Sequence, residues 1–303
     1  MDDRAAMSIF PHDLPLLTQE EMAREVVNWL DEHPGIGVHP TSRIPMICKT
    51  VLKCAGREST PDDPEYTELV QSFKDVQELW FVTRVLGSAL ANPPFLEPFV
   101  RAAANDSVLP ERSGSQTKGR DAQFELFVGA VGFRAGLRVE NLGEGQPDWL
   151  MRSATRTWSV EAKRAKSAEA VNRLAHKAVE QIDRSKIGGV MVIDVSAIEG
   201  ADGRRLLDHV PDQELNHLRK EKGERIRQFG LPQICKLIGN TPVGLFVAHD
   251  YVVRPAGIGP DGAQTPWGLI GMWWAYLLEP DSSPYYSRYL EFWELFEAGL
   301  PAL

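Results

Sequence analysis

The chain has 303 residues, of which 43% are hydrophobic and 25% are charged, values that exclude a disordered or fibrous protein. Its three cysteines lack the spacing of a zinc site or a disulfide framework, and the first ten residues carry two acids and no apolar run of the secretory kind. The longest apolar stretch, residues 268–278, is shorter than the roughly 20 residues that span a bilayer, so we expect a cytoplasmic protein with no membrane partner.

The formal net charge of −9 is spread unevenly along the chain. Residues 1–111 contain nine Lys and Arg against eighteen Asp and Glu, whereas residues 112–199 contain fourteen against eleven. Local field matters more than net charge for steering a ligand. The middle segment is therefore compatible with nucleic-acid binding although the whole chain is acidic.

The first third of the sequence is typical of helices. Apolar residues recur at helical spacing in residues 18–33 and again in residues 65–91, with proline-rich breaks between them. Residues 113–119, SGSQTKG, are small and polar, as in a linker or surface loop. We predict an acidic helical domain over residues 1–112, suited to docking a protein partner or to self-association, and a second domain over residues 113–303.

The second domain is predicted to be α/β. Helical and strand patterns alternate from residue 120 onward, and a strand, an amphipathic helix and an apolar strand in succession predict a right-handed parallel βαβ crossover. The predicted helices cover residues 121–133, 168–185, about 212–229 and a terminal segment from Pro284; the predicted strands cover residues 138–141, two segments within 145–167, and residues 190–195, 242–253 and 267–278.

Residues 145–167, GQPDWLMRSATRTWSVEAKRAKS, contain two expected strands joined by a short loop. If the strands form a hairpin in which Arg152 lies opposite Thr157, the same register places Asp148 opposite Glu161. Directly opposed residues have Cβ atoms about 4.5–5.5 Å apart, a separation at which like charges destabilise a sheet. We therefore expect a cation between these two carboxylates.

Side-chain alternation along the second strand places a lysine near the expected cation. Glu161 and Lys163 share one face of their strand, because successive side chains point to opposite faces. Mg²⁺ binds one or two carboxylates and keeps its other positions for water and substrate phosphate. Lys163 can hold a water molecule or stabilise charge on a phosphate beside it.

A structural interpretation competes with this chemical one. The tripeptide Glu-x-Lys is expected by chance about once in a chain of this length and composition. The alternative is an exposed hairpin in which Glu161 and Lys163 form a solvated ion pair.

The pair Pro147-Asp148 followed by Glu161-Ala162-Lys163 resembles the PD-(D/E)xK nuclease superfamily, over about residues 117–198. The resemblance implies a restriction-endonuclease-like core, in which a mixed central sheet is flanked by helices, here preceded by the all-α N-terminal domain. It implies that Asp148 and Glu161 bind Mg²⁺, for which Mn²⁺ can substitute, and that Lys163 serves the attacking water.

Two further residues follow from the same resemblance. Many members carry a metal-binding Glu on the first helix, where this chain has Glu125 within an otherwise apolar segment; an ordinary exposed Glu is the alternative. Some carry Gln-x-x-x-Tyr on the second helix, where Gln181 is the candidate catalytic residue and Ser185 stands at the Tyr position. A plain glutamine on the helix flank is the alternative for Gln181.

Four cations around the motif are candidates for contacts with phosphates, taken as a group rather than singly: Lys118, Arg120, Arg164 and Lys166. The combined prediction is a Mg²⁺-dependent nuclease that hydrolyses phosphodiester bonds, with DNA the favoured partner and with endo or exo action left open. An RNA-cutting enzyme with the same site and a non-catalytic nucleic-acid-binding or partner-docking protein are the alternatives. A role in antiviral defence against foreign DNA is implied by the resemblance alone.

Overall fold

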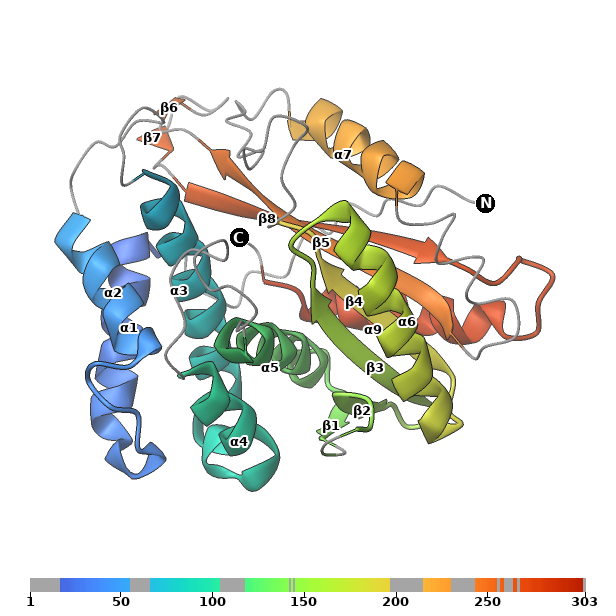
Figure 1. Cartoon of the computed structure of the whole chain (residues 1–303), viewed down its shortest axis with the longest axis horizontal. Helices are drawn as coiled ribbons and strands as arrows, with labels where there is room; N and C mark the ends of the chain where they lie inside the picture. The colour runs from blue at the N-terminus through green and yellow to red at the C-terminus, as the bar shows by residue number, and fades with distance from the viewer. Residues whose placement is uncertain are drawn as a thin grey trace. The chain divides into compact units, whose positions relative to one another are not determined.

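The computed structural model describes residues 17–54, 66–103, 118–141, 143, 145–196, 215–229, 243–254, 257–258, 264–265 and 268–301 (Figure 1). The chain divides into two compact units, one of residues 13–130 and one of residues 131–303 together with residues 1–12. The division falls inside a helix, α5, whereas the boundary predicted from composition lies after residue 112. Among the described residues, no helix combines the length and the apolar character needed to cross a membrane.

Helices make up the described part of residues 13–130. The predicted helical segments 18–33 and 65–91 correspond to α1 and to α3 with the 3₁₀ turn that follows it, whereas α2 and α4 were not predicted, because each contains a proline that interrupts the pattern. The elements are α1 (Gln19–Glu32), a 3₁₀ turn (Pro34–Ile36), α2 (Arg43–Cys54), α3 (Tyr66–Leu86), a second 3₁₀ turn (Gly87–Ala91), α4 (Pro93–Ala102) and most of α5 (Lys118–Arg134).

A buried polar network joins α2, α3 and α5 inside this helical unit. Asp75 of α3 accepts hydrogen bonds from Arg43 at 2.8 Å and from Arg120 at 3.3 Å. Gln123 of α5 bonds both Arg43, at 2.8 Å, and Glu78. Buried charges are tolerated only when they are paired and hydrogen-bonded, so this network fixes how the three helices pack.

The unit that contains residues 131–303 is built on a six-stranded mixed sheet in the order β1-β2-β3-β4-β5-β8. The first three strands are antiparallel neighbours, β3, β4 and β5 run parallel, and β8 closes the described sheet antiparallel to β5. The strands are β1 (Arg138–Glu140), β2 (Trp149–Arg152), β3 (Thr157–Arg164), β4 (Gly189–Asp194), β5 (Val243–Arg254) and β8 (Gly268–Leu277); β6 (Gly257–Ile258) and β7 (Gln264–Thr265) form a separate ribbon.

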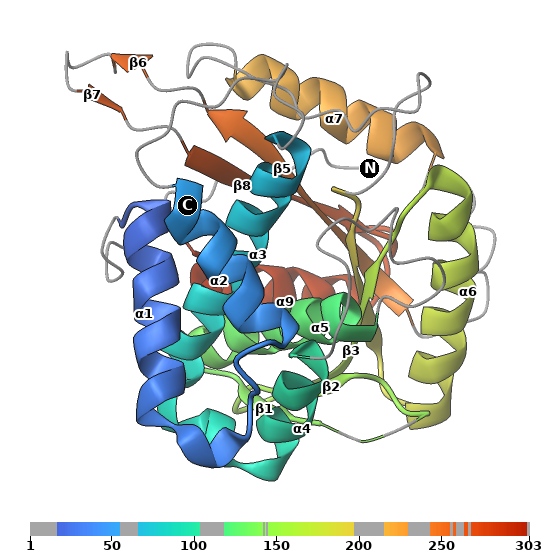
Figure 2. The ribbon, with the colours of Figure 1, turned by 60° about the vertical axis from the view of Figure 1, so that its left-hand side comes forward.

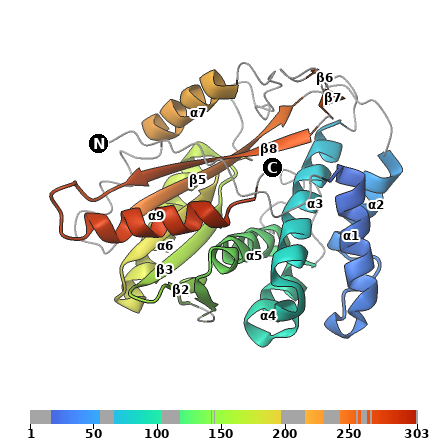
Figure 3. The same ribbon diagram turned by 180° about the vertical axis from the view of Figure 1, so that it is seen from behind.

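Helices cover both faces of this sheet, as Figures 2 and 3 show from two sides. α6 (Ala168–Ser185) and α7 (Leu215–Phe229) lie on one face, and α9 (Tyr286–Gly299) lies on the other. Successive side chains of β8 point to these two faces in turn. The indole of Trp274 donates to the backbone of α7, whereas Trp273 packs on Phe296 of α9. The predicted α/β class is thereby confirmed.

The crossover between β3 and β4 follows the sequence pattern closely. Ser167 caps α6 by accepting a hydrogen bond from the Ala170 amide, and the helix spans the predicted residues. The predicted apolar stripe faces the sheet, with its core members fully buried: Val171, Ala175, Ala178 and Ile182. β3 and β4 pair in parallel, as the amphipathic crossover helix predicted.

Candidate functional site

The hairpin of β2 and β3 has the register predicted from the sequence. Arg152 pairs with Thr157, and Trp149 pairs with Val160. Asp148 is the residue immediately before β2, so the register carries it to the level of Glu161. The two carboxylates of the motif are therefore brought together by the pairing of these strands.

Direct contacts link the three motif residues. Asp148 Oδ2 accepts a hydrogen bond from the amide of Ala162 at 2.8 Å and lies 3.4 Å from Lys163 Nζ. Glu161 Oε2 accepts a hydrogen bond from the amide of Asp148 at 3.0 Å, and its Oε1 forms an ion pair with Lys163. Each carboxylate thus receives one main-chain amide from the opposite strand and shares the same ammonium group.

Glu161 is the buried member of this cluster. Its side chain is fully buried, whereas those of Asp148 and Lys163 are 12% and 17% exposed. Burial, and then the neighbouring Asp148 carboxylate, raise the pKa of Glu161 well above its usual value, and Lys163 opposes this shift only in part. The ionised cluster is therefore short of positive charge.

The burial of Glu161 argues against the alternative of an exposed hairpin with a solvated ion pair between Glu161 and Lys163. An exposed hairpin with a solvated ion pair requires an edge position, but β3 lies between β2 and β4 and is the third of the six strands. The Glu161 carboxylate is held inside the unit at a free-energy cost, and a buried ionisable group of that kind is characteristic of functional sites.

The donor set suits a hard divalent cation. Asp148 and Glu161 offer carboxylate oxygens, the ligands that Mg²⁺ and Mn²⁺ prefer. The raised pKa of Glu161 shows that the cluster would gain from a further positive charge. These residues therefore fit the predicted metal, with Lys163 beside it.

Side chains from α6 and from the residue after β1 contact the backbone around Asp148. Gln181 Nε2 donates to the carbonyl of Gln146 at 3.0 Å, and Arg184 Nη1 donates to the carbonyl one residue earlier at 2.9 Å. On the other side, Asn141 Nδ2 donates to the carbonyl of Asp148 at 2.9 Å. The catalytic role of Gln181 stays a prediction, and its described contact positions the backbone two residues before Asp148.

The sequence offered no signal for Asn141 or Arg184. Both side chains donate to backbone carbonyls rather than to side chains. Every residue type has a backbone carbonyl, so the sequence does not indicate such a partner. Such outer residues nonetheless orient the groups that bind a metal.

Glu125, the predicted third metal ligand, lies on α5 in the helical unit. Its Oε2 accepts a hydrogen bond from Arg101 Nη2 at 3.0 Å. Arg101 thereby supplies a partner of the kind that a nearly buried glutamate requires. A metal ligand at this position stays a prediction.

Two of the four cations predicted to contact phosphates lie in the interior. Arg120 is 1% exposed and pairs with Asp75. Arg164 is 8% exposed, and its Nε lies 2.7 Å from Asp194, the residue opposite it in the parallel pairing of β3 and β4. Their guanidinium groups stabilise the two units rather than offering contacts to a polyanion.

The other two cations of that group remain accessible to solvent. Lys118 is exposed at the start of α5, and Lys166 is half-buried just before α6. The predicted group of phosphate contacts is thus reduced to these two lysines.

Comparisons of the chain with protein-family models, with curated proteins and with solved structures found no match.

Proposed function

We propose that this chain is a metal-dependent nuclease of the PD-(D/E)xK kind. The observation that carries the proposal is the cluster of Asp148, Glu161 and Lys163, in which a fully buried carboxylate is kept beside a second one and a lysine. Burial of a carboxylate next to a like charge destabilises a fold. A buried carboxylate at a residue of the motif is accounted for if the site binds a metal cation when the protein functions.

The order of elements around the cluster supports the same proposal. α5, the three antiparallel strands β1 to β3, the crossover helix α6 and the parallel strand β4 follow one another along the chain. This is the succession of helix, mixed sheet and second helix that the resemblance implies for a restriction-endonuclease-like core.

Each residue of the cluster has a distinct part in the proposed hydrolysis. Asp148 and Glu161 would hold Mg²⁺, which when bound activates water and neutralises charge on the phosphate. Lys163 is partly exposed and presents its ammonium group to the water or to a phosphate oxygen. The amides of Asp148 and Ala162 fix the two carboxylates in place. In the proposed hydrolysis the water oxygen would bond to phosphorus, the bond to the leaving oxygen would break, and the proton lost by the water would pass through solvent to that leaving oxygen.

We propose DNA as the substrate and nucleic acid as the principal partner, with Lys118 and Lys166 the remaining candidates for phosphate contacts. The acidic helical unit is proposed to dock a protein partner or a second copy of the chain. An RNA-cutting enzyme would use the same cluster, so the substrate has to be found by assay.

The test is incubation of the purified protein with plasmid DNA, single-stranded DNA and RNA, each with Mg²⁺ and with excess chelator. We expect cleavage of DNA that requires the metal. Cleavage of RNA alone would replace the proposed substrate and leave the site in place. If no nucleic acid is cut in Mg²⁺ or Mn²⁺, the chain is a non-catalytic protein and the proposal fails.

A further inference from the structure

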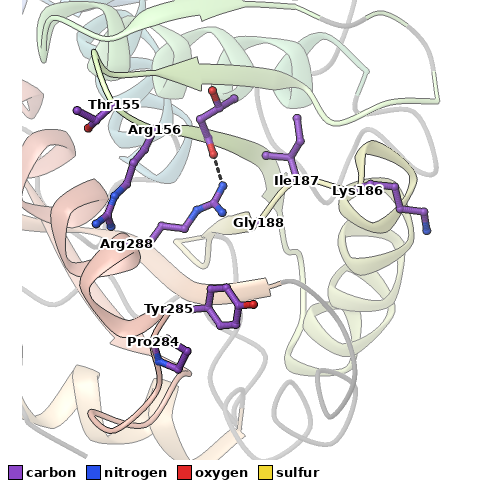
Figure 4. A pocket seen from close by; sticks show the side chains of 9 residues that line it. Thr155, Arg156, Lys186, Ile187, Gly188, Pro284, Tyr285 and Arg288 are labelled. Atoms are coloured by element: carbon purple, nitrogen blue, oxygen red, sulfur yellow. Dashed lines mark hydrogen bonds between the residues drawn. The ribbon is translucent and has the colours of Figure 1, made fainter.

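A second cluster of cations lies around an open pocket of about 480 Å³ in the unit that contains the sheet (Figure 4). Three segments distant in sequence line it: the turn between β2 and β3, the turn between α6 and β4, and the start of α9. Pockets that bind small molecules are typically about 300–1,000 Å³. The space therefore suits a ligand of modest size.

Its lining is basic and hydroxyl-rich. Arg156, Lys186 and Arg288 line it, and none of its nine described lining residues is acidic. The hydroxyl side chains of Thr155, Thr157 and Tyr285 also belong to the lining.

Nearby carboxylates cancel only part of this charge. Glu291 pairs with Arg156 Nε at 3.1 Å, and Asp183 pairs with Lys186 at 2.9 Å. Arg288 forms no ion pair with a carboxylate in the part of the chain that the structure describes. One positive charge thus remains without an acidic partner there.

Both arginines retain hydrogen-bonding capacity that the protein does not use. Arg156 Nη1 and Arg288 Nε are buried and make no hydrogen bond within the described residues. A buried donor without an acceptor is unfavourable. Guanidinium groups match phosphate geometry, so an anionic ligand with several oxygens suits the pocket that these two arginines line.

The backbone is arranged so that Arg288 can occupy this position. The guanidinium of Arg288 donates to the carbonyl of Thr157, as Figure 4 shows, and packs on Gly188. A Cβ at Gly188 would lie 3.0 Å from Arg288 Cζ and 2.8 Å from the Tyr289 hydroxyl, so a larger residue would displace the arginine. In the same figure the amine of Lys186 is turned away from the two arginines, which places it at the rim.

We infer that this pocket binds a phosphate group, held by Arg156 and Arg288 with help from the surrounding hydroxyls. It is an anion site, distinct from the cation site proposed at Asp148, Glu161 and Lys163, and it is independent of metal. The phosphate can come from a free nucleotide or from the 5′ end of a nucleic-acid strand, since both present the same monoester.

The test measures binding without divalent metal and in the Glu161→Gln background, so that the proposed nuclease site contributes neither cleavage nor metal. The probes are inorganic phosphate, deoxyadenosine 5′-monophosphate, and one oligonucleotide with either a 5′-phosphate or a 5′-hydroxyl, titrated calorimetrically at constant ionic strength. We expect saturable binding of the monophosphate, weakened about tenfold or more by Arg156→Gln and by Arg288→Gln.

Two controls separate the site from general charge effects. Arg138→Gln removes an exposed cation on β1 and should leave binding unchanged. Lys186→Asn removes the rim charge at a residue with φ of 56°, a conformation that asparagine tolerates, and should weaken binding less than the arginine variants.

The outcomes decide the proposal and the source of the phosphate. Tighter binding of the 5′-phosphorylated oligonucleotide than of the nucleotide identifies a strand end, and equal or weaker binding identifies a free nucleotide. The inference is overturned if no phosphate-bearing probe binds saturably, or if the folded Arg156→Gln variant binds as tightly as the parent. Neither result depends on whether the protein cleaves nucleic acid.

Discussion

Replacing Glu161 by Gln and Lys163 by Met should change stability in opposite directions. When all three side chains are ionised, Asp148, Glu161 and Lys163 together carry one net negative charge in a largely buried place. Glu161→Gln makes the cluster neutral, because Asp148 and Lys163 remain 3.4 Å apart as a pair. Lys163→Met leaves two carboxylates and no cation.

The sign of each effect follows from the direction in which the pKa of Glu161 is shifted. Burial and Asp148 raise that pKa, so the ionised form of Glu161 is disfavoured in the native state. Replacing a buried charged group by a neutral one of similar volume is often stabilising, so we expect Glu161→Gln to increase the free energy of unfolding by about 1–2 kcal/mol near pH 8. Lys163→Met should decrease it by about 3 kcal/mol or more, because it leaves a buried charge without its partner.

The pH dependence has a definite sign. A carboxyl group with a raised native pKa stabilises the fold below its unfolded pKa of 4.5, and this contribution is lost as the pH rises through its native value. The advantage of Glu161→Gln over the parent should therefore be largest at alkaline pH and should diminish toward pH 4.5. The loss in Lys163→Met should likewise become smaller in acid, where Glu161 takes up a proton.

Urea unfolding near pH 8 and near pH 5, without metal, measures these differences. Glu140→Gln is the matched control, since Glu140 pairs with two arginines on the same sheet but is 30% exposed, and surface pairs contribute about 0–1 kcal/mol. A loss of more than about 2 kcal/mol in Glu161→Gln near pH 8 would show that the carboxylate stabilises the fold, and the reasoning would be refuted.

Three further predictions concern the loop, the metal and the thiols. Gln181→Met should lower cleavage about tenfold, as loss of an outer positioning group does, whereas His176→Ala, exposed on the same helix, should not; equal rates for the two variants would remove the positioning role. Mg²⁺ or Mn²⁺ should support cleavage and Ca²⁺ should support binding with little turnover, so full activity in excess chelator would contradict the metal site. Burial raises the pKa of the Cys48 thiol to about 12, so at pH 8 a thiol reagent should label the half-buried Cys54 in the native protein and Cys48 only after unfolding; mass spectrometry of labelled peptides decides this.

Local patterns in the sequence determine much of the architecture. The extent of α6 follows from its apolar stripe and from the cap at Ser167, both of which are properties of neighbouring residues. The register of β2 and β3 follows from a short connecting loop and from alternation, and it brings Asp148 to Glu161. Short-range regularities of this kind can be recognised without knowledge of the rest of the fold.

Long-range partners could not be recognised in this way. Arg120 and Arg164 look like surface cations in the sequence, but their partners, Asp75 and Asp194, are 45 and 30 residues away along the chain. The arginine pair around the pocket brings together the β2–β3 turn and α9, so no motif could have indicated it.

The division into compact units differs from the boundary predicted from composition for a related reason. Composition changes at residues 113–119, but α5 continues the packing of the helical unit beyond that point, as the contact of Phe127 with Phe81 shows. A fragment that begins at residue 113 would lose the partners of this part of α5, so charge substitutions in the intact chain are the better test of nucleic-acid binding.

The most direct test of the proposed function is the rate at which matched preparations of the parent protein, Asp148→Asn, Glu161→Gln and Lys163→Met cut plasmid DNA in Mg²⁺. All variants should be shown to be folded under the assay conditions by their melting temperatures. We predict that the parent cuts and that each variant falls to the background rate, although Glu161→Gln is more stable than the parent. Cleavage by folded Glu161→Gln at the parental rate would contradict the assignment of this cluster as the catalytic site.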